Sequence, residues 1–488
     1  MKKSIFCLIS IFYLSANAIA QIDTSSNTII SLTLNGTILD ENNIPLPYVN
    51  IISLNTGKGT ISNENGNFSL DISSLNDTNI IRYQCIGYKT TDHKIESLKS
   101  NSIILLSENI YTLDEVVVLG ITPNPEKIVK NILAFKDSNY RTIPHKKQVF
   151  IRERNTFDIL NLKLNFKKSN FPSLNSEVIQ KLEENIPKHT QSYSDLLTNI
   201  YINKNKIKFE PIKSVALKEK DITELKNLAE NIQNDLSLND GEYLRIKTGL
   251  IGTNKVSLSF PDSSATLVKG YTSYIRDALY FSTFEDEEQW EFLHNPNKYN
   301  FKIIGGTSVN NESVYIIDFT AKKRGRFEGR LYVSIATYAL IRADYKYAPN
   351  KLGKDFHMLG FGYSETNFSG SIYFEKNKNN YNLKYFSFQN SNKFNVNRKV
   401  TFIKKKKSFL INKKINALKL GLDITQENKF SIELLVVGKV QISKQDFEDF
   451  EEAKYIDVTY VNQFDKSLWE NHTTIAPTQK MKDYKKIE

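Results

Sequence analysis

Residues 314–347, VYIIDFTAKKRGRFEGRLYVSIATYALIRADYKY, decide the fold class of the longest part of this chain. Runs rich in β-branched and aromatic residues occur at 314–319, 329–334 and 340–345, which is typical of strands. A basic turn at Lys322–Arg326 follows the first run. Connections this short join antiparallel strands, because parallel strands need long crossovers. The stretch therefore predicts an antiparallel meander.

The same pattern continues toward the C-terminus. We expect an antiparallel β meander over residues 241–442, with further strands at Ser371–Phe374, Leu383–Phe388, Val400–Ile403 and Ile432–Val437. A sheet of this length has to curl. We expect a curved half-barrel around an apolar face, and an ordinary closed sandwich is the alternative. Residues 443–488 are expected to form a polar C-terminal tail.

On the N-terminal side of the meander, residues 125–240 predict a mixed, largely helical segment with one strand-like run at Gln148–Ile151. Asn124 can cap a helix that has Pro125 at its first position. A second helix is expected between Asn175 and Pro187, and a third carries Leu225, Leu228 and Ile232 on one face. The sequence leaves two roles open for this segment, a separate unit or a cover over the sheet. It also leaves open whether residues 125–488 form one domain or two.

Residues 28–108 are expected to form a small β-sandwich, because short strands alternate with turn residues and no helical period occurs. Asn65-Gly66 predicts a type I′ hairpin turn, which needs positive φ at both residues. Cys85 is the only cysteine beyond residue 20, and its neighbours Tyr83 and Ile86 favour a buried strand position. The fold class is therefore mainly β, α+β overall.

Four motifs make the sandwich resemble the carboxypeptidase-regulatory-like family. These are GTILD at 36–40, IPLPYVNI at 44–51, GTISNENGNF at 59–68 and IGY at 86–88. This family of transthyretin-like sandwiches precedes many envelope proteins and TonB-dependent receptors, and it implies no protease. Residues 109–124 are expected to form a linker, and Leu113–Gly120 within it resembles the strand near the TonB-contacting box of those receptors. That strand either contacts TonB or pairs locally.

The block at 314–347 also resembles the central hairpins of periplasmic lipoprotein carriers with LolA-like half-barrels. This resemblance implies a concave sheet that can shelter acyl chains or another apolar group.

Residues 1–20 predict a secretory signal peptide. Lys2 and Lys3 precede an apolar run at Ile5–Leu14, and Ala18-Ile19-Ala20 forms a small-residue cleavage site. Removing residues 1–20 would leave 468 of the 488 residues and a net charge of +9 in place of +11. We therefore expect an exported protein of the periplasm, with an association to the outer membrane open, and no transmembrane segment in the mature chain.

The densest basic cluster is Lys404–Lys407. Lysines often guard the edge strand of a sheet against pairing with other chains. A contact with anionic lipid is the other interpretation of this cluster. A nucleic-acid role does not suit an exported chain.

No catalytic, cofactor-binding or metal-binding residue is assigned. His93 and Glu96 have the spacing of a zinc ligand pair, but positions three apart on a strand face opposite ways. Gly362-Tyr363-Ser364-Glu365-Thr366 departs from the G-x-S-x-G nucleophile elbow at its last position. The acidic run Glu285–Glu288 is typical of a solvated helix start. The other histidines show no ligand spacing: His145, His189, His294, His357 and His472.

Three functions follow as hypotheses. The first is a non-enzymatic binding or accessory protein that shelters an apolar ligand such as a lipid acyl chain in a curved sheet; it requires a groove. The second is a structural partner of an outer-membrane receptor, held through Leu113–Gly120 by strand addition. The third is a hydrolase whose site arises from residues distant in sequence. The identity of ligand and partner and the oligomeric state do not follow from the sequence.

Overall fold

A computed structural model describes residues 33–73, 75–98, 101–111, 123–141, 143–218, 234–248, 251–252, 266–267, 272–309, 312–408 and 412–484. The expected signal peptide at 1–20, the strand at 113–120 and the helix with Leu225, Leu228 and Ile232 lie outside these residues. No helix in the described part is both long and apolar enough to cross a membrane.

The N-terminal region consists of two small sheets packed on each other. One has the order β4-β1-β7 and the other β3-β2-β5-β6. Ile38, Ile51 and Tyr83 are fully buried between them, and Cys85 is buried as expected. The strands are β1 (Thr33–Asp40), β2 (Asn50–Ser53), β3 (Gly59–Ile61), β4 (Asn67–Asp71), β5 (Ile80–Gln84), β6 (Thr91–Lys94) and β7 (Ser102–Leu106).

The hairpin expected at Asn65-Gly66 is wrong. The turn joins β3 to β4, which belong to different sheets and do not pair. Only Gly66 has a positive φ, +74°. The side chain of Asn63 forms the turn, because its Oδ1 accepts hydrogen bonds from the backbone N–H groups of Asn65 (2.9 Å) and Asn67 (3.0 Å). An Asx turn of this kind replaces the type I′ turn.

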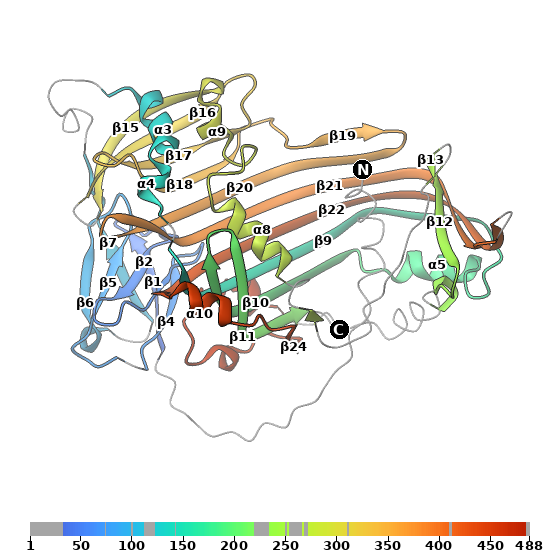
Figure 1. The fold of residues 1–488 in the computed structure, drawn as a ribbon, viewed down its shortest axis with the longest axis horizontal. Helices are drawn as coiled ribbons and strands as arrows, with labels where there is room; N and C mark the ends of the chain where they lie inside the picture. The colour runs from blue at the N-terminus through green and yellow to red at the C-terminus, as the bar shows by residue number, and fades with distance from the viewer. Residues whose placement is uncertain are drawn as a thin grey trace.

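A large open sheet makes up most of the molecule. Its order is β24-β11-β10-β9-β22-β21-β20-β18-β17-β16-β15-β8, and within this path all pairs are antiparallel except β11 with β24. The expected curved antiparallel sheet is confirmed (Figure 1). Its strands, with the side strands β12, β13 and β19, are β8 (Ile110–Tyr111), β9 (His145–Ser169), β10 (His189–Asn203), β11 (Lys206–Lys218), β12 (Glu242–Thr248), β13 (Ile251–Gly252), β15 (Tyr299–Val309), β16 (Glu312–Ala321), β17 (Phe327–Ser334), β18 (Leu340–Tyr347), β19 (Asp355–Met358), β20 (Phe361–Asn377), β21 (Asn380–Lys406), β22 (Lys413–Gln441) and β24 (Val458–Val461).

The helices are short and lie beside this sheet. Side chains cap the two helices that begin at Pro125 and Ser176. Asn124 accepts a hydrogen bond from the Lys127 N–H (3.1 Å), and Asn175 accepts one from the Val178 N–H (3.0 Å). The helices are α3 (Pro125–Ala134), α4 (Lys136–Asn139), α5 (Ser176–Asn185), α8 (Ser273–Phe281), α9 (Glu291–His294), α10 (Lys444–Asp449) and α11 (Gln479–Lys482). Single turns of 3-10 helix are η2 (Ile95–Ser97), η3 (Pro296–Lys298) and η4 (Lys466–Trp469), and a two-stranded sheet joins β14 (Thr266–Leu267) to β23 (Tyr455–Ile456).

The expectation of a largely helical segment at 125–240 is wrong for its described residues. Three long strands, β9, β10 and β11, occupy most of it and enter the large sheet. The signal was present in the sequence, because Phe157, Ile159, Leu162, Leu164 and Phe166 follow a near-alternating strand pattern. Apolar residues at helical spacing precede and follow β9, and they favoured the interpretation of the whole segment as helical.

The expectation of a polar tail at 443–488 is also wrong. Ile475 is fully buried, Met481 is 4% exposed, and β24 pairs with β11. The charged residues that end the sequence dominate its composition, yet the apolar residues before them pack against the body of the protein. The division of the chain into independent domains stays a prediction.

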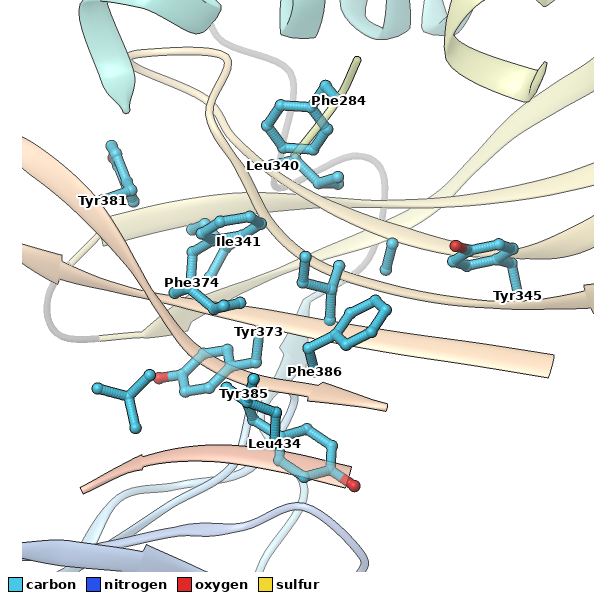
Figure 2. Close-up of a cluster of buried hydrophobic side chains, with 14 of the residues drawn as sticks. Phe284, Leu340, Ile341, Tyr345, Tyr373, Phe374, Tyr381, Tyr385, Phe386 and Leu434 are labelled. Atoms are coloured by element: carbon cyan, nitrogen blue, oxygen red, sulfur yellow. The ribbon is translucent and has the colours of Figure 1, made fainter. Parts of the chain in front are cut away.

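The main hydrophobic core lies on both sides of the central strands. Figure 2 shows Phe284, from the connection between α8 and α9, on one side and Tyr385 of β21 on the other, toward the N-terminal strands. Phe284 contacts Trp290 (5.2 Å between ring centroids) and Phe374 (5.6 Å). Trp290 is the largest fully buried side chain of the described residues. The helices therefore fill the apolar face of the sheet that we expected to hold a ligand.

His145 at the start of β9 predicts a pH dependence of stability. It is 1% exposed, its Nδ1 lies 2.7 Å from the Ile143 carbonyl oxygen, and its Nε2 has no hydrogen-bond partner. Burial, assisted by the nearby charge of Lys147, lowers its pKa to about 3. Below pH 6.5 the unfolded chain therefore binds a proton that the folded chain does not, and stability falls as the pH falls.

By pH 5 this loss amounts to about 2 kcal/mol. We expect denaturant unfolding of the wild type at pH 7 and pH 5 to show this loss, and His145→Gln to reduce it. Equal pH dependence in the two proteins would contradict the assignment.

Candidate functional site

A cavity of about 720 Å³ lies on one face of the large sheet. Eight strands line it: β9, β10, β16, β17, β18, β20, β21 and β22. Tyr48 and Glu64 line it from turns of the N-terminal region, and Thr478 lines it from the C-terminal segment. Three regions far apart in the sequence therefore meet at this cavity.

The floor of the cavity is a row of polar side chains that crosses the sheet. Residues directly opposite each other on neighbouring antiparallel strands project to the same face. The register places the following residues in one row: Asp195, Arg152, Glu433, Ser387, Ser371, Asp344, Arg330 and Asp318. A second row beside it contains Tyr193, Arg154, Ser431, Gln389, Ser369, Lys346 and Glu328.

Ion pairs between neighbouring strands hold the two ends of the first row. Arg152 binds Asp195 through two hydrogen bonds of 2.8 and 2.7 Å, and both side chains are almost fully buried. At the other end, Arg330 binds Asp318 through two bonds of 2.6 and 3.0 Å. Bidentate pairs fix the guanidinium plane and so fix the shape of the floor.

Glu433 stands in the middle of the row. It accepts a hydrogen bond from the Tyr385 hydroxyl (2.9 Å), and burial raises the pKa of its carboxyl although the charge of Arg152 opposes the rise. The repulsion of Glu64 and Asp195 adds to the rise of this pKa. Protonation of Glu433 is therefore easier than that of an ordinary glutamate, which makes the charge of the floor sensitive to what binds above it.

Tyr48 joins the N-terminal sheets to this floor. Its ring packs on that of Tyr385, with 5.0 Å between the centroids, and the Arg342 guanidinium lies 5.7 Å from it. Tyr48 adopts a φ of +62°, which costs a non-glycine residue on the order of 1 kcal/mol. Packing between the two regions therefore holds a backbone conformation that the isolated segment would avoid.

The C-terminal segment closes the cavity beside Arg152. Arg152 donates to the carbonyl oxygens of Ile475 (2.9 Å) and Ala476 (3.1 Å), and Asn63 donates to the same Ala476 oxygen (3.1 Å). Thr60 donates to the Thr474 carbonyl oxygen (2.8 Å). The segment is thus bound to the N-terminal sheets and to the large sheet at once.

The residues considered from the sequence lie elsewhere. His93 is on β6 with its ring against Tyr83, 5.7 Å between centroids, and Glu96 in η2 pairs with Lys94 (3.2 Å). No group of three or more histidine, cysteine or acidic side chains that could hold a metal ion occurs in the described residues.

Ser364 lies in an exposed cluster on the β19–β20 hairpin. Its Oγ donates to Asp355 Oδ1 (2.5 Å), and His357 Nε2 is 3.2 Å from Ser364 Oγ and 3.1 Å from Asp355 Oδ1. In a hydrolytic triad the histidine contacts the serine through one ring nitrogen and the acid through the other. Here one nitrogen faces both groups, so the cluster lacks the geometry of a nucleophile with its base.

The acidic run at 285–288 is structural. Glu285 pairs with Lys136 (2.5 Å), Glu288 pairs with Lys354 (3.1 Å), and Asp286 accepts a hydrogen bond from the Gln289 N–H (2.8 Å). These contacts fix the connection between α8 and α9.

Sequence reasoning did not find the residues of the cavity floor. A local signal existed: Ser387 and Gln389 alternate with apolar residues on β21, and Ser431 and Glu433 alternate with apolar residues on β22. Such an alternation marks one face of a strand as polar. Only the register between strands shows that these faces coincide.

Comparison with known proteins identifies the N-terminal region. Residues 34–118 match the family model described as the CarboxypepD_reg-like domain. This segment is a CarboxypepD_reg-like domain. The TonB-dependent receptor P39 of Formosa agariphila is 35% identical over 97 residues, which cover 20% of this chain and 9% of the receptor. The match therefore spans less than a tenth of that receptor's length, and the resemblance drawn from the motifs is confirmed for this domain.

Two solved structures were also found to be similar over part of the chain. The Pseudomonas aeruginosa MucA/MucB complex covers 63% of this chain and 93% of its own, with 7% identity and a TM-score of 0.17. A putative outer membrane lipoprotein-sorting protein domain from Vibrio parahaemolyticus covers 66% and 97%, with 9% identity and a TM-score of 0.20. Similarity at this level does not establish a common fold.

Proposed function

We propose that this chain is a non-enzymatic binding protein of a bacterial cell envelope, exported to the periplasm or attached to the outer membrane. Its ligand occupies the cavity between the CarboxypepD_reg-like domain and the large sheet. The observation that carries this proposal is the cavity of about 720 Å³ with two rows of polar side chains across its floor. A volume of this size is in the range of ligand-binding clefts.

The charged side chains on the floor favour a ligand that carries polar groups, although apolar surface makes up the larger part of the lining. Arg154, Glu328, Lys346 and Glu433 all border the cavity. An acyl chain placed over these groups would remove water from them without replacing their hydrogen bonds, which is unfavourable. A ligand with hydroxyl, amide or charged groups can replace those bonds, and the ring of Tyr48 offers it an apolar surface. The apolar ligand expected from the sequence remains the alternative, and the extraction experiment below distinguishes it from a polar ligand.

Binding rather than catalysis is supported by the types of residue in the site. The described residues that line the cavity include no histidine and no cysteine. Glu433, whose pKa is raised, accepts its hydrogen bond from the Tyr385 hydroxyl. An envelope location is supported by the signal peptide expected at residues 1–20 and by the receptor similarity of the N-terminal domain.

The test is native mass spectrometry of the mature protein purified from its own periplasm, followed by extraction into water and into an organic solvent. We expect a bound species that partitions into the aqueous phase. A bound lipid in the organic phase would restore the apolar-ligand hypothesis. A protein that never carries a bound species from cell extracts would contradict the binding function.

A further inference from the structure

Six lysines lie between residues 404 and 414, at the hairpin that joins β21 to β22. This hairpin is at the opposite end of the long strands from the N-terminal sheets (Figure 1). Lys406 lies 17 residues along β21 from Gln389, the cavity residue nearest to it on that strand, which is about 55 Å at roughly 3.3 Å per residue. The hairpin is therefore remote from the cavity. Its role is therefore separate from ligand binding in that cavity.

The interpretation of Lys404–Lys407 as guards of an edge strand is wrong. At these residues β21 pairs with β12 on one side and β22 on the other, so it is not an edge. Lys404 is 8% exposed and binds Glu242 (3.1 Å) and the Ser237 carbonyl oxygen (2.6 Å). Lys404 is therefore a structural residue that holds β12 to β21.

The remaining lysines repel one another. The register sets Lys405 directly opposite Lys414 and Lys406 directly opposite Lys413. Like charges in directly opposed positions destabilise a strand pair. Lys406, Lys407, Lys413 and Lys414 are exposed, and none of the four forms an ion pair with an acidic side chain in the described part of the chain. Glu242 of β12 stands directly opposite Lys406, but its carboxylate is already paired with Lys404. This end of the sheet therefore keeps a net positive charge, at a cost in stability.

We propose that this lysine-rich hairpin end, formed by Lys406, Lys407, Lys413 and Lys414, binds an anionic membrane surface. An anionic surface removes the repulsion between the opposed lysines, since each gains a negative counterpart. The hairpin end would set the protein against a bilayer, with the cavity held away from it.

The experiment is vesicle co-sedimentation with the full mature chain. Vesicles of phosphatidylcholine mixed with phosphatidylglycerol are compared with vesicles of phosphatidylcholine alone. We expect binding only to the anionic vesicles, and weaker binding as salt is raised. Lys413→Gln with Lys414→Gln should weaken the partition coefficient by about 30-fold, roughly fivefold for each lysine.

The matched control is Lys322→Gln with Lys323→Gln, which removes the same charge from exposed positions in the turn between β16 and β17. It should leave vesicle binding unchanged. Lys413→Gln with Lys414→Gln removes opposed like charges, so it should not lower the melting temperature. Weaker vesicle binding by this variant would therefore not be due to misfolding.

Three outcomes would overturn the proposal. They are equal losses in the two double variants, equal binding to neutral and anionic vesicles, and binding to a DNA duplex without binding to anionic vesicles.

Discussion

Arg152→Ala destabilises the folded protein by about 3–5 kcal/mol, because it leaves the carboxylate of Asp195 buried and unpaired. Both side chains are buried, at 6% and 2% exposure, and Arg152 also donates to two carbonyl oxygens of the C-terminal segment. The substitution therefore removes an ion pair within the sheet and the contact that closes the cavity. Unfolding in denaturant, followed by circular dichroism, measures the change in the free energy of unfolding.

Arg154→Ala is the matched control. Arg154 lies two residues along β9 on the same face, borders the cavity and is only partly buried. We expect a loss below about 1 kcal/mol. Replacing the pair together, Arg152→Met with Asp195→Leu, should lose less than Arg152→Ala alone, because no unpaired charge is left. A loss in Arg152→Ala no larger than that in Arg154→Ala would show that the ion pair does not anchor the site.

Trp290→Ala is expected to cost about 3–5 kcal/mol, since it removes the largest fully buried side chain of the described residues and leaves a void. The indole N–H donates to the Phe281 carbonyl oxygen (3.1 Å), and the ring lies 5.4 Å from that of Tyr345. The helices α8 and α9 should separate from the apolar face of the sheet. We expect the near-ultraviolet circular dichroism of Trp290→Ala to be lost at a lower denaturant concentration than that of the wild type, which would report this separation.

Tyr280→Ala serves as the control for Trp290. Tyr280 is on α8 and 51% exposed, so its removal should change the free energy of unfolding by less than about 0.5 kcal/mol. Should the two variants unfold at the same denaturant concentration, the packing of α8 and α9 on the sheet would not contribute to stability as the structure indicates.

The parts of the fold that follow local rules could be predicted from the sequence. The caps at Asn124 and Asn175 depend on residues three positions apart, and the meander at 314–347 depends on alternation within short runs. Of strand β9 only Gln148–Ile151 was predicted, because apolar residues at helical spacing before and after the strand favoured helices for the rest of the segment. The turn at Asn65-Gly66 was misassigned because the hydrogen bonds of Asn63 decide it, and they are not visible in the dipeptide.

The candidate site could not be predicted, because its residues come together only through the register between neighbouring strands of the large sheet. Glu433 and Arg152 are adjacent only since β22 pairs with β9 across nearly three hundred residues of sequence. The closing contacts of Ala476 join three regions through a backbone oxygen, which carries no sequence signal at all. The two polar rows would have been visible only as alternation in each strand taken separately.

Native mass spectrometry of a variant with the cavity filled tests directly whether the ligand binds above the polar rows. Ser431→Trp places a large side chain on the floor, at a partly buried position that borders the cavity. We expect wild-type protein from the periplasm to carry a bound species and Ser431→Trp, with the same charge-state distribution, to carry none. A variant that retains the bound species in the same proportion would contradict this expectation.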